Sequence, residues 1–193
     1  MSYDPLRAPN PGQGLAHVES YWAATAGPAP EDDGPVSGDR EAEVAIVGGG
    51  YTGLSCAAYL AREHGIRALV LEANRPGWGC SGRNGSFLRP SLGRLSYSDW
   101  VARWGEAGAR RLFAESLAAY GTGRALIEDG GIDCDVQPDG ALRIAHRAAR
   151  VRDLEREHRV LERVFDYPAE LLGPDEIAAR HFEGREAHAA LRT

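Results

Sequence analysis

The sequence contains no lysine, so all 22 of its basic residues are arginines. The lack of lysine excludes any mechanism that needs a Schiff-base lysine or a lysine general base within this chain. There are 28 acidic residues, which gives a net charge of −6, and the arginines form no basic cluster. We therefore expect neither nucleic acid nor an anionic membrane as a partner.

Cysteine is also scarce, since the chain has only Cys56, Cys80 and Cys134, far apart and without a C-x-x-C pair. This spacing supports neither a disulfide framework nor a zinc site. No apolar run approaches the roughly 20 residues of a membrane-spanning helix, and we expect no secretory signal in residues 1–11. The 43% hydrophobic and 26% charged residues are typical of globular proteins. Since we expect neither a membrane span nor a secretory signal, we expect a cytoplasmic protein.

Residues 1–40 differ in composition from the rest of the chain. They are rich in proline and glycine and include an acidic run at 31–33. We therefore expect an N-terminal extension that is mostly coil. Within it, only Leu15–Ala24 has the apolar character that would let it dock on a core.

Residues 44–71 show the pattern of a β-α-β unit. The continuous apolar runs Val44–Val47 and Ala68–Leu71 are typical of strands that are buried on both faces. Between them, apolar residues spaced three and four apart predict a helix from Tyr51, and Gly65 stands where a helix C-cap is expected. A right-handed parallel crossover is the common way to build such a unit, so we predict an α/β, Rossmann-like fold.

The second half of the chain predicts helices with short strands between them. We expect a helix over 106–128 and an amphipathic helix over 147–165. Residues 133–136 and 141–145 read as the two strands of a hairpin around the turn Pro138-Asp139-Gly140. A short helix is expected to begin at Pro174, with acidic residues in its first turn.

The glycine pattern Gly48-x-Gly50-x-x-Gly53 lies between the first predicted strand and the helix. In a dinucleotide-binding turn the first glycine permits a tight bend, the second leaves room for a pyrophosphate, and the third lets the helix pack close to the strand. The amides of the first helical turn then hold the phosphates. The motif in this context predicts dinucleotide binding. A structural glycine-rich turn is the alternative.

Glu72 ends the second predicted strand, 19 residues after Gly53. An acid at this distance accepts hydrogen bonds from an adenosine ribose. Its negative charge argues against a 2′-phosphate and so against NADP. The motif by itself does not separate FAD from NAD.

The loop over residues 75–89 is too long for a simple connector. Its glycines suit a backbone pressed against a flat ligand, while Ser81, Arg83 and Asn84 supply hydrogen bonds and a positive charge. An isoalloxazine ring and its ribityl-pyrophosphate tail need such a set of groups. A solvated surface loop is the alternative.

Two strings, VAIVGGGYTGLSCAAYLAREHG at 44–65 and LVLEANRPGWGCSGRNGS at 69–86, resemble the FAD-dependent amine and amino-acid oxidases of the D-amino-acid oxidase superfamily. Within that superfamily, the likeness is to the gamma-glutamylputrescine oxidase type. The segments SYWAATA at 20–26, DCD at 133–135 and GALRIA at 140–145 are also similar to that branch.

The resemblance implies a division of the chain and a set of cofactor-binding residues. Residues 41–132 would be the N-terminal part of the FAD-binding domain, and 133–193 the beginning of a substrate-binding domain. The five residues at the glycine turn, from Gly48 to Gly53, would hold the FAD pyrophosphate. Glu72 would bind the adenosine ribose, and the three loop residues from Ser81 to Asn84 would approach the flavin. The implied residues are Gly48, Gly50, Tyr51, Thr52, Gly53, Glu72, Ser81, Arg83 and Asn84.

The implied activity is oxidation of the C–N bond of a small-molecule amine or amino acid, gamma-glutamylputrescine-like, with oxygen as the acceptor. Covalently bound flavin in related enzymes uses a histidine in the loop, and none occurs between His64 and His146, so we expect non-covalent FAD. Ser86 stands where the family has a second glycine.

Members of the family are much longer than this chain. We therefore expect a fragment whose catalytic residues lie elsewhere and which is inactive alone. Two other hypotheses stay open: an NAD-linked dehydrogenase on the same fold, and a non-catalytic truncated remnant.

Overall fold

The computed structural model describes residues 15–29, 31–138 and 140–193, which form two compact units. The first unit ends at Phe87 and the second begins at Leu88. Most of the prolines of the expected extension, and Asp139 of the expected hairpin turn, lie outside the described residues.

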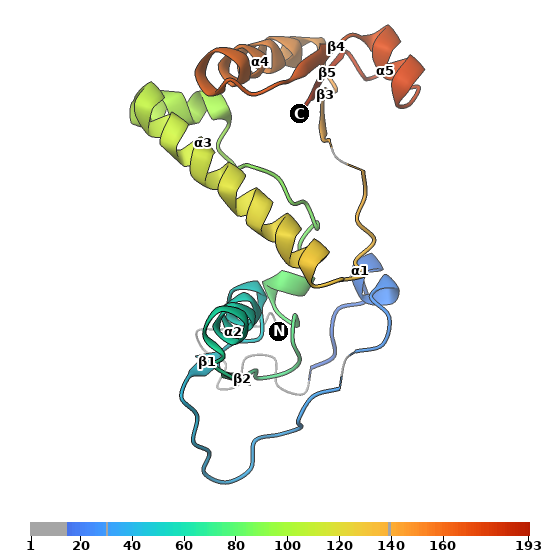
Figure 1. Cartoon of the computed structure of the whole chain (residues 1–193). Coiled ribbons are helices and arrows are strands. Elements are labelled where there is room, and N and C mark those ends of the chain that lie inside the picture. The colour runs from blue at the N-terminus through green and yellow to red at the C-terminus, as the bar shows by residue number, and fades with distance from the viewer. Residues whose placement is uncertain (1–14, 30, 139) are drawn as a thin grey trace. The chain divides into compact units, whose positions relative to one another are not determined.

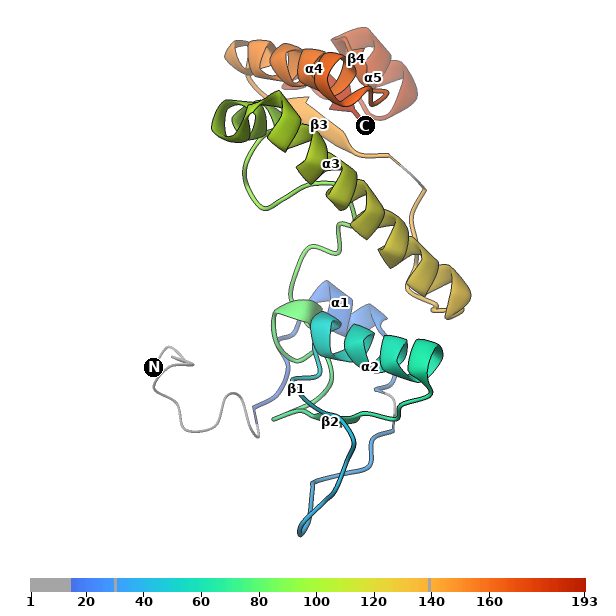
Figure 2. The same cartoon turned by 60° about the vertical axis from the view of Figure 1, so that its left-hand side comes forward.

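The first unit contains the predicted β-α-β arrangement. Strand β1 (Ala45–Val47) leads into helix α2 (Tyr51–His64), and strand β2 (Leu69–Leu71) follows. The two strands pair in parallel, with Ile46 opposite Val70. Helix α2 lies along this strand pair in both views (Figures 1 and 2). The α/β prediction for this segment is confirmed.

Helix α2 ends at the predicted glycine. Gly65 has a φ of 68°, in the left-handed region, and its N–H donates to the carbonyl of Ala61. The next amide, that of Ile66, donates to the carbonyl of Leu60. These bonds satisfy two carbonyls of the last helical turns, as is usual at a glycine C-cap.

The expected burial of both strands on two faces is wrong for the described residues. Val47 is 87% exposed, and no residue of β1 or β2 is fully buried. The reason is that β1 and β2 form a sheet of two strands, on which α2 packs. An apolar run of this kind suits a wider, doubly covered sheet.

Helix α3 (Tyr97–Asp129) is longer than the predicted helix over 106–128. Its first segment stops at Gly105, which has non-helical φ and ψ of 68° and 169°. The segment begins at a capping box in which Ser96 and Asp99 satisfy each other's backbone amides. The Ser96 hydroxyl and, to a smaller extent, the Ser96 N–H donate to the Asp99 carboxylate and so lower its pKa.

The predicted hairpin over 133–145 is wrong. Residues 133–136 form no strand, and β3 (Leu142–Ala145) pairs instead with β5 (Ala189–Arg192). Strand β5 also pairs with β4 (Glu170–Leu172), which gives an antiparallel sheet of order β3-β5-β4. The physical reason is burial: three residues of β5 are buried, whereas 133–136 offers polar and exposed residues.

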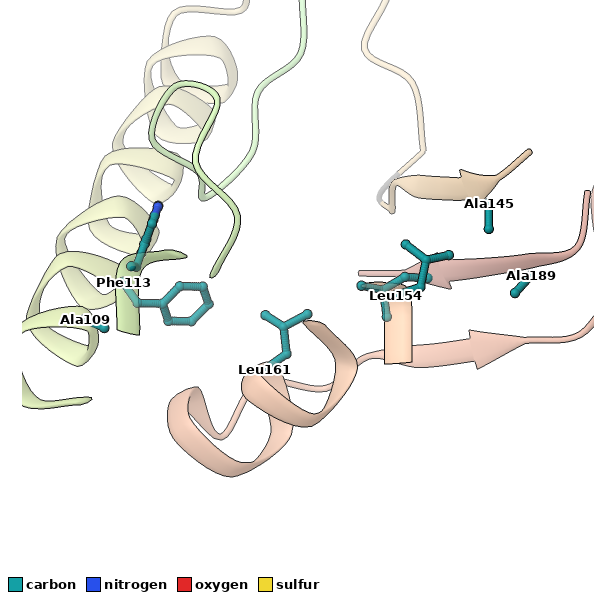
Figure 3. Close-up of a cluster of buried hydrophobic side chains, with 8 residues drawn as sticks. Ala109, Phe113, Ala145, Leu154, Leu161 and Ala189 are labelled. Atoms are coloured by element: carbon teal, nitrogen blue, oxygen red, sulfur yellow. The ribbon is translucent and has the colours of Figure 1, made fainter. Parts of the chain in front are cut away.

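The other two predicted helices are confirmed. Helix α4 (Val151–Phe165) follows a 3-10 turn over Ala148–Arg150, and α5 (Pro174–Arg180) starts at its proline. Helices α3 and α4 pack on each other, and α4 also packs on the sheet. Figure 3 shows Phe113 of α3 and Leu161 of α4 in the core of this unit. The Phe113 ring stacks on that of Phe165, with centroids 4.5 Å apart.

Glu157 of α4 is a charged residue in this core, only 3% exposed. Its carboxylate accepts hydrogen bonds from the N–H of Tyr97 at 2.8 Å and from the N–H of Ser98 at 3.1 Å, and also from the Ser98 hydroxyl. Arg143 lies 3.9 Å away. The carboxylate thus satisfies the first amides of α3, where a negative charge also favours the helix dipole.

We predict that Glu157→Gln destabilises the second unit by about 2–3 kcal/mol, because it removes the buried charge that the α3 amides face. Glu155→Gln, on the same helix but not buried, is the matched control and should change stability by less than about 0.5 kcal/mol. Urea unfolding followed by circular dichroism measures both. Equal unfolding midpoints for the two variants would contradict this role of Glu157.

Candidate dinucleotide-binding site

The glycine turn between β1 and α2 is as tight as its sequence predicts. Gly48 has a φ of 103°, which side chains rarely tolerate, and its N–H donates to the carbonyl of Leu71 at 2.8 Å. A Cβ on Gly53 would lie 2.0 Å from the carbonyl oxygen of Gly48. Helix α2 therefore starts directly against the turn, and only glycine fits at position 53.

The N-terminus of α2 donates a hydrogen bond to a side-chain oxygen of the same chain. Gly50 is its N-cap residue and contributes no side-chain cap. The N–H of Tyr51 donates instead to the hydroxyl oxygen of Ser81 at 2.9 Å. A Cβ on Gly50 would lie 2.9 Å from the same oxygen. Tyr51 and Thr52 are exposed, so the first helical turn is open to solvent and to a ligand.

The structure brings Glu72 to this turn. One carboxylate oxygen accepts from the N–H of Gly49 at 2.7 Å, and the other accepts from the N–H of Asn74 at 3.1 Å. The acid is thus held by two main-chain amides, one from the glycine turn and one from the loop that follows β2. Its place beside the glycine turn is the one that the motif spacing predicts for a ribose-binding carboxylate.

The loop after β2 packs back on the glycine turn. The N–H of Gly77 donates to the carbonyl of Gly49 at 2.8 Å, and a 3-10 turn over Cys80–Gly82 follows. A Cβ on Gly82 would lie 2.2 Å from the carbonyl oxygen of Gly77. The loop therefore closes tightly on itself and presents Ser81 to helix α2.

Arg83 and Asn84 make their hydrogen bonds within the loop. The Nε of Arg83 donates to the carbonyl of Trp78 at 2.6 Å, and the guanidinium carbon lies 4.2 Å from the centre of the Trp78 ring. The amide of Asn84 donates to the carbonyls of Cys80 and Ser81 at 3.1 and 2.9 Å. Both side chains order the loop in this structure.

Sequence reasoning thus anticipated most of the groups that meet here. The structure brings together Gly48, Gly50, Tyr51, Gly53, Glu72 and Ser81, while Arg83 and Asn84 lie further along the loop. The sequence did not single out Gly49 or Asn74. Gly49 lies inside the motif, and Asn74 lies just beyond the acid, so proximity to Glu72 was the available signal.

Other kinds of site receive no support from the described residues. They contain no group of three or more histidine, cysteine or acidic residues that could hold a metal ion. Their helices include none that is long and apolar enough to cross a membrane. Cys56, Cys80 and Cys134 are free and exposed.

Comparison with known proteins places this turn in a wider context. Residues 43–193 match the DAO family, described as FAD dependent oxidoreductase. The chain is 37% identical over 174 residues to gamma-glutamylputrescine oxidoreductase from Escherichia coli K12, covering 87% of this chain and 39% of that protein. It is 38% identical over 134 residues to the probable oxidoreductase OrdL of Rhizobium meliloti, covering 68% of this chain and 30% of that one.

A solved structure has a similar fold. Glycine oxidase from Bacillus cereus aligns with a TM-score of 0.54 at 22% identity, over 79% of this chain and 38% of that chain. At this identity the likeness concerns the fold alone. In each of these comparisons, the chain spans well under half of the other protein's length.

We predict that Gly53→Ala destabilises the first unit by about 2–3 kcal/mol, because the new Cβ overlaps the Gly48 carbonyl. Gly121→Ala is the control, since this helical glycine of α3 has open space around it. That change should be neutral or slightly stabilising. Thermal unfolding followed by circular dichroism compares them. A Gly53→Ala variant as stable as Gly121→Ala would show that α2 does not start against the turn.

Proposed function

Because this chain belongs to the DAO family of FAD-dependent oxidoreductases, we propose that its β1–α2 turn binds the pyrophosphate of FAD. The observation that carries the proposal is the hydrogen bond from the Tyr51 N–H to an oxygen at the start of α2. A phosphate oxygen would accept a hydrogen bond from the same donor, and the positive end of the helix dipole favours the negative charge of the phosphate.

The residues around the turn fit this cofactor. Gly50 leaves no side chain between the helix terminus and a ligand, and Gly53 allows the helix to start at the turn. The hydroxyl of Ser81 lies beside the same amide, where it can also contact a phosphate. Glu72, fixed by the N–H of Gly49, presents a carboxylate suited to the ribose hydroxyls and unsuited to a 2′-phosphate. The family match favours FAD over NAD here.

We propose further that the reaction is oxidation of an amine C–N bond, of a gamma-glutamylputrescine-like substrate. The support is the 37% identity with the Escherichia coli oxidoreductase, whose name gives its substrate. FAD held at this site would supply the redox chemistry of C–N oxidation, with oxygen as the proposed electron acceptor. The part of this chain is to hold the pyrophosphate at α2 and the ribose at Glu72, with Arg83 and Asn84 shaping the loop that approaches the flavin.

We predict that the chain binds FAD non-covalently and that Glu72→Gln weakens this binding about tenfold, because a charged acceptor of the ribose hydroxyls is lost. Glu63→Gln is the matched control, since Glu63 is an exposed residue of α2 paired with Arg62. Quenching of FAD fluorescence on titration with protein measures the dissociation constants. Equal affinities for the two variants would contradict the ribose assignment, and no saturable binding to the wild-type chain would contradict the site.

The amine assignment can be tested in a chimera, since this chain spans 39% of the Escherichia coli oxidoreductase. The aligned part of this chain replaces the matching region of that enzyme. We expect the chimera to retain FAD and to release hydrogen peroxide from gamma-glutamylputrescine, and the chain alone to release none. Glycine serves as the comparison substrate. A chimera that holds FAD and prefers glycine would overturn the proposed substrate class.

A further inference from the structure

The segment Leu15–Val18, which we call the strap, lies on the loop that follows β2. The carbonyl of Leu15 accepts two hydrogen bonds from that loop, one from the side-chain amide of Asn74 at 2.9 Å and one from the indole N–H of Trp78 at 3.1 Å. Both donors are about sixty residues away along the chain. The contact is therefore a tertiary contact and not part of a local turn.

Each of the two donors also contacts a residue of the candidate site. The backbone N–H of Asn74 donates to the Glu72 carboxylate, so this side of the strap contact reaches the ribose acid. The carbonyl of Trp78 accepts from Arg83, and the Trp78 ring lies under the Arg83 guanidinium. A single carbonyl of the strap thus links Glu72 to the loop that would approach the flavin.

The strap also touches the tightest point of the loop. An ideal Cβ on Gly82 would lie 3.3 Å from Nε2 of His17, and 2.2 Å from the Gly77 carbonyl oxygen. Gly82 is next to Ser81, whose hydroxyl accepts from the first amide of α2. His17 therefore lies beside Gly82, the residue that follows Ser81 in the chain.

We propose that the strap is a positioning element of the FAD site and that Trp78 is the positioning residue through which it acts. The strap holds Asn74 and Trp78, and these in turn hold Glu72 and Arg83 where a cofactor can meet them. This inference rests on the proposed FAD binding. Because coupling between two binding events is reciprocal, bound FAD should also fix the strap on the loop.

The test compares Trp78→Phe with Trp104→Phe in the full chain. Phenylalanine keeps an aromatic ring at position 78 and removes the indole N–H that donates to Leu15. Trp104 is the matched control: it is 41% exposed, lies in the second unit, and has Arg103 over its ring at 5.3 Å. Hydrogen exchange of residues 15–18 and 77–82 is measured without FAD and with saturating FAD. FAD affinity is measured by fluorescence quenching.

We expect Trp78→Phe to exchange faster than wild type at 15–18 and 77–82 without FAD, and to bind FAD about two- to tenfold more weakly. Trp104→Phe should match wild type in both respects, and FAD should slow exchange of the strap in the wild type. Unchanged exchange of the strap in Trp78→Phe would overturn the proposal. So would faster exchange of the strap with unchanged loop exchange and FAD affinity.

The same experiment separates this proposal from the function on which it rests. If the wild-type chain binds no FAD, the proposed function fails. The exchange measured without FAD still decides whether the strap holds the loop, because it needs no cofactor.

Discussion

The candidate site depends on the direct contact between the start of helix α2 and the carbonyl of Gly48. A Cβ at position 53 would lie 2.0 Å from that oxygen, so the helix begins as close to β1 as the backbone permits. This closeness fixes where the first helical amides point. It also brings the N–H of Gly49 within reach of Glu72 and the N–H of Tyr51 within reach of Ser81. The groups that meet at the glycine turn are placed relative to this one contact.

The two units are stabilised in different ways. The second unit has an apolar core with fully buried side chains such as Trp100 and Leu161. The buried carboxylate of Glu157 lies in this unit and caps α3. In the first unit Gly53 and Gly49 are buried beside strands that stay partly exposed. There the loop, the glycine turn and the strap are joined mainly by backbone and side-chain hydrogen bonds. A site held by polar contacts can exchange some of them for those of a ligand.

The sequence correctly predicted the structural features that local interactions determine. The β-α-β order, the helix end at Gly65 and the approach of Glu72 to the glycine turn follow from residues close together in the chain, and all are present. Contacts between distant residues were not predictable in the same way. Glu157 caps a helix that begins 60 residues earlier, and β3 pairs with the distant strand β5 where a hairpin was expected.

The site was predicted incompletely for the same physical reason. Ser81, Arg83 and Asn84 were chosen for their chemistry, but their positions depend on how the loop folds. The structure places Ser81 at the helix terminus and directs Arg83 to Trp78. The strap contact through Leu15 was expected only as docking of an apolar stretch. No pattern indicated that a backbone carbonyl would receive the two donors.

The most direct test of this account is a titration of the isotope-labelled chain with FAD, followed by backbone amide chemical shifts. The account predicts saturable shifts that are largest for the amides of residues 49–53, with Ser81 next, because the pyrophosphate lies at the start of α2. Shifts confined to other parts of the chain, or none at saturating FAD, would contradict the central claim that this glycine turn is a dinucleotide-binding site.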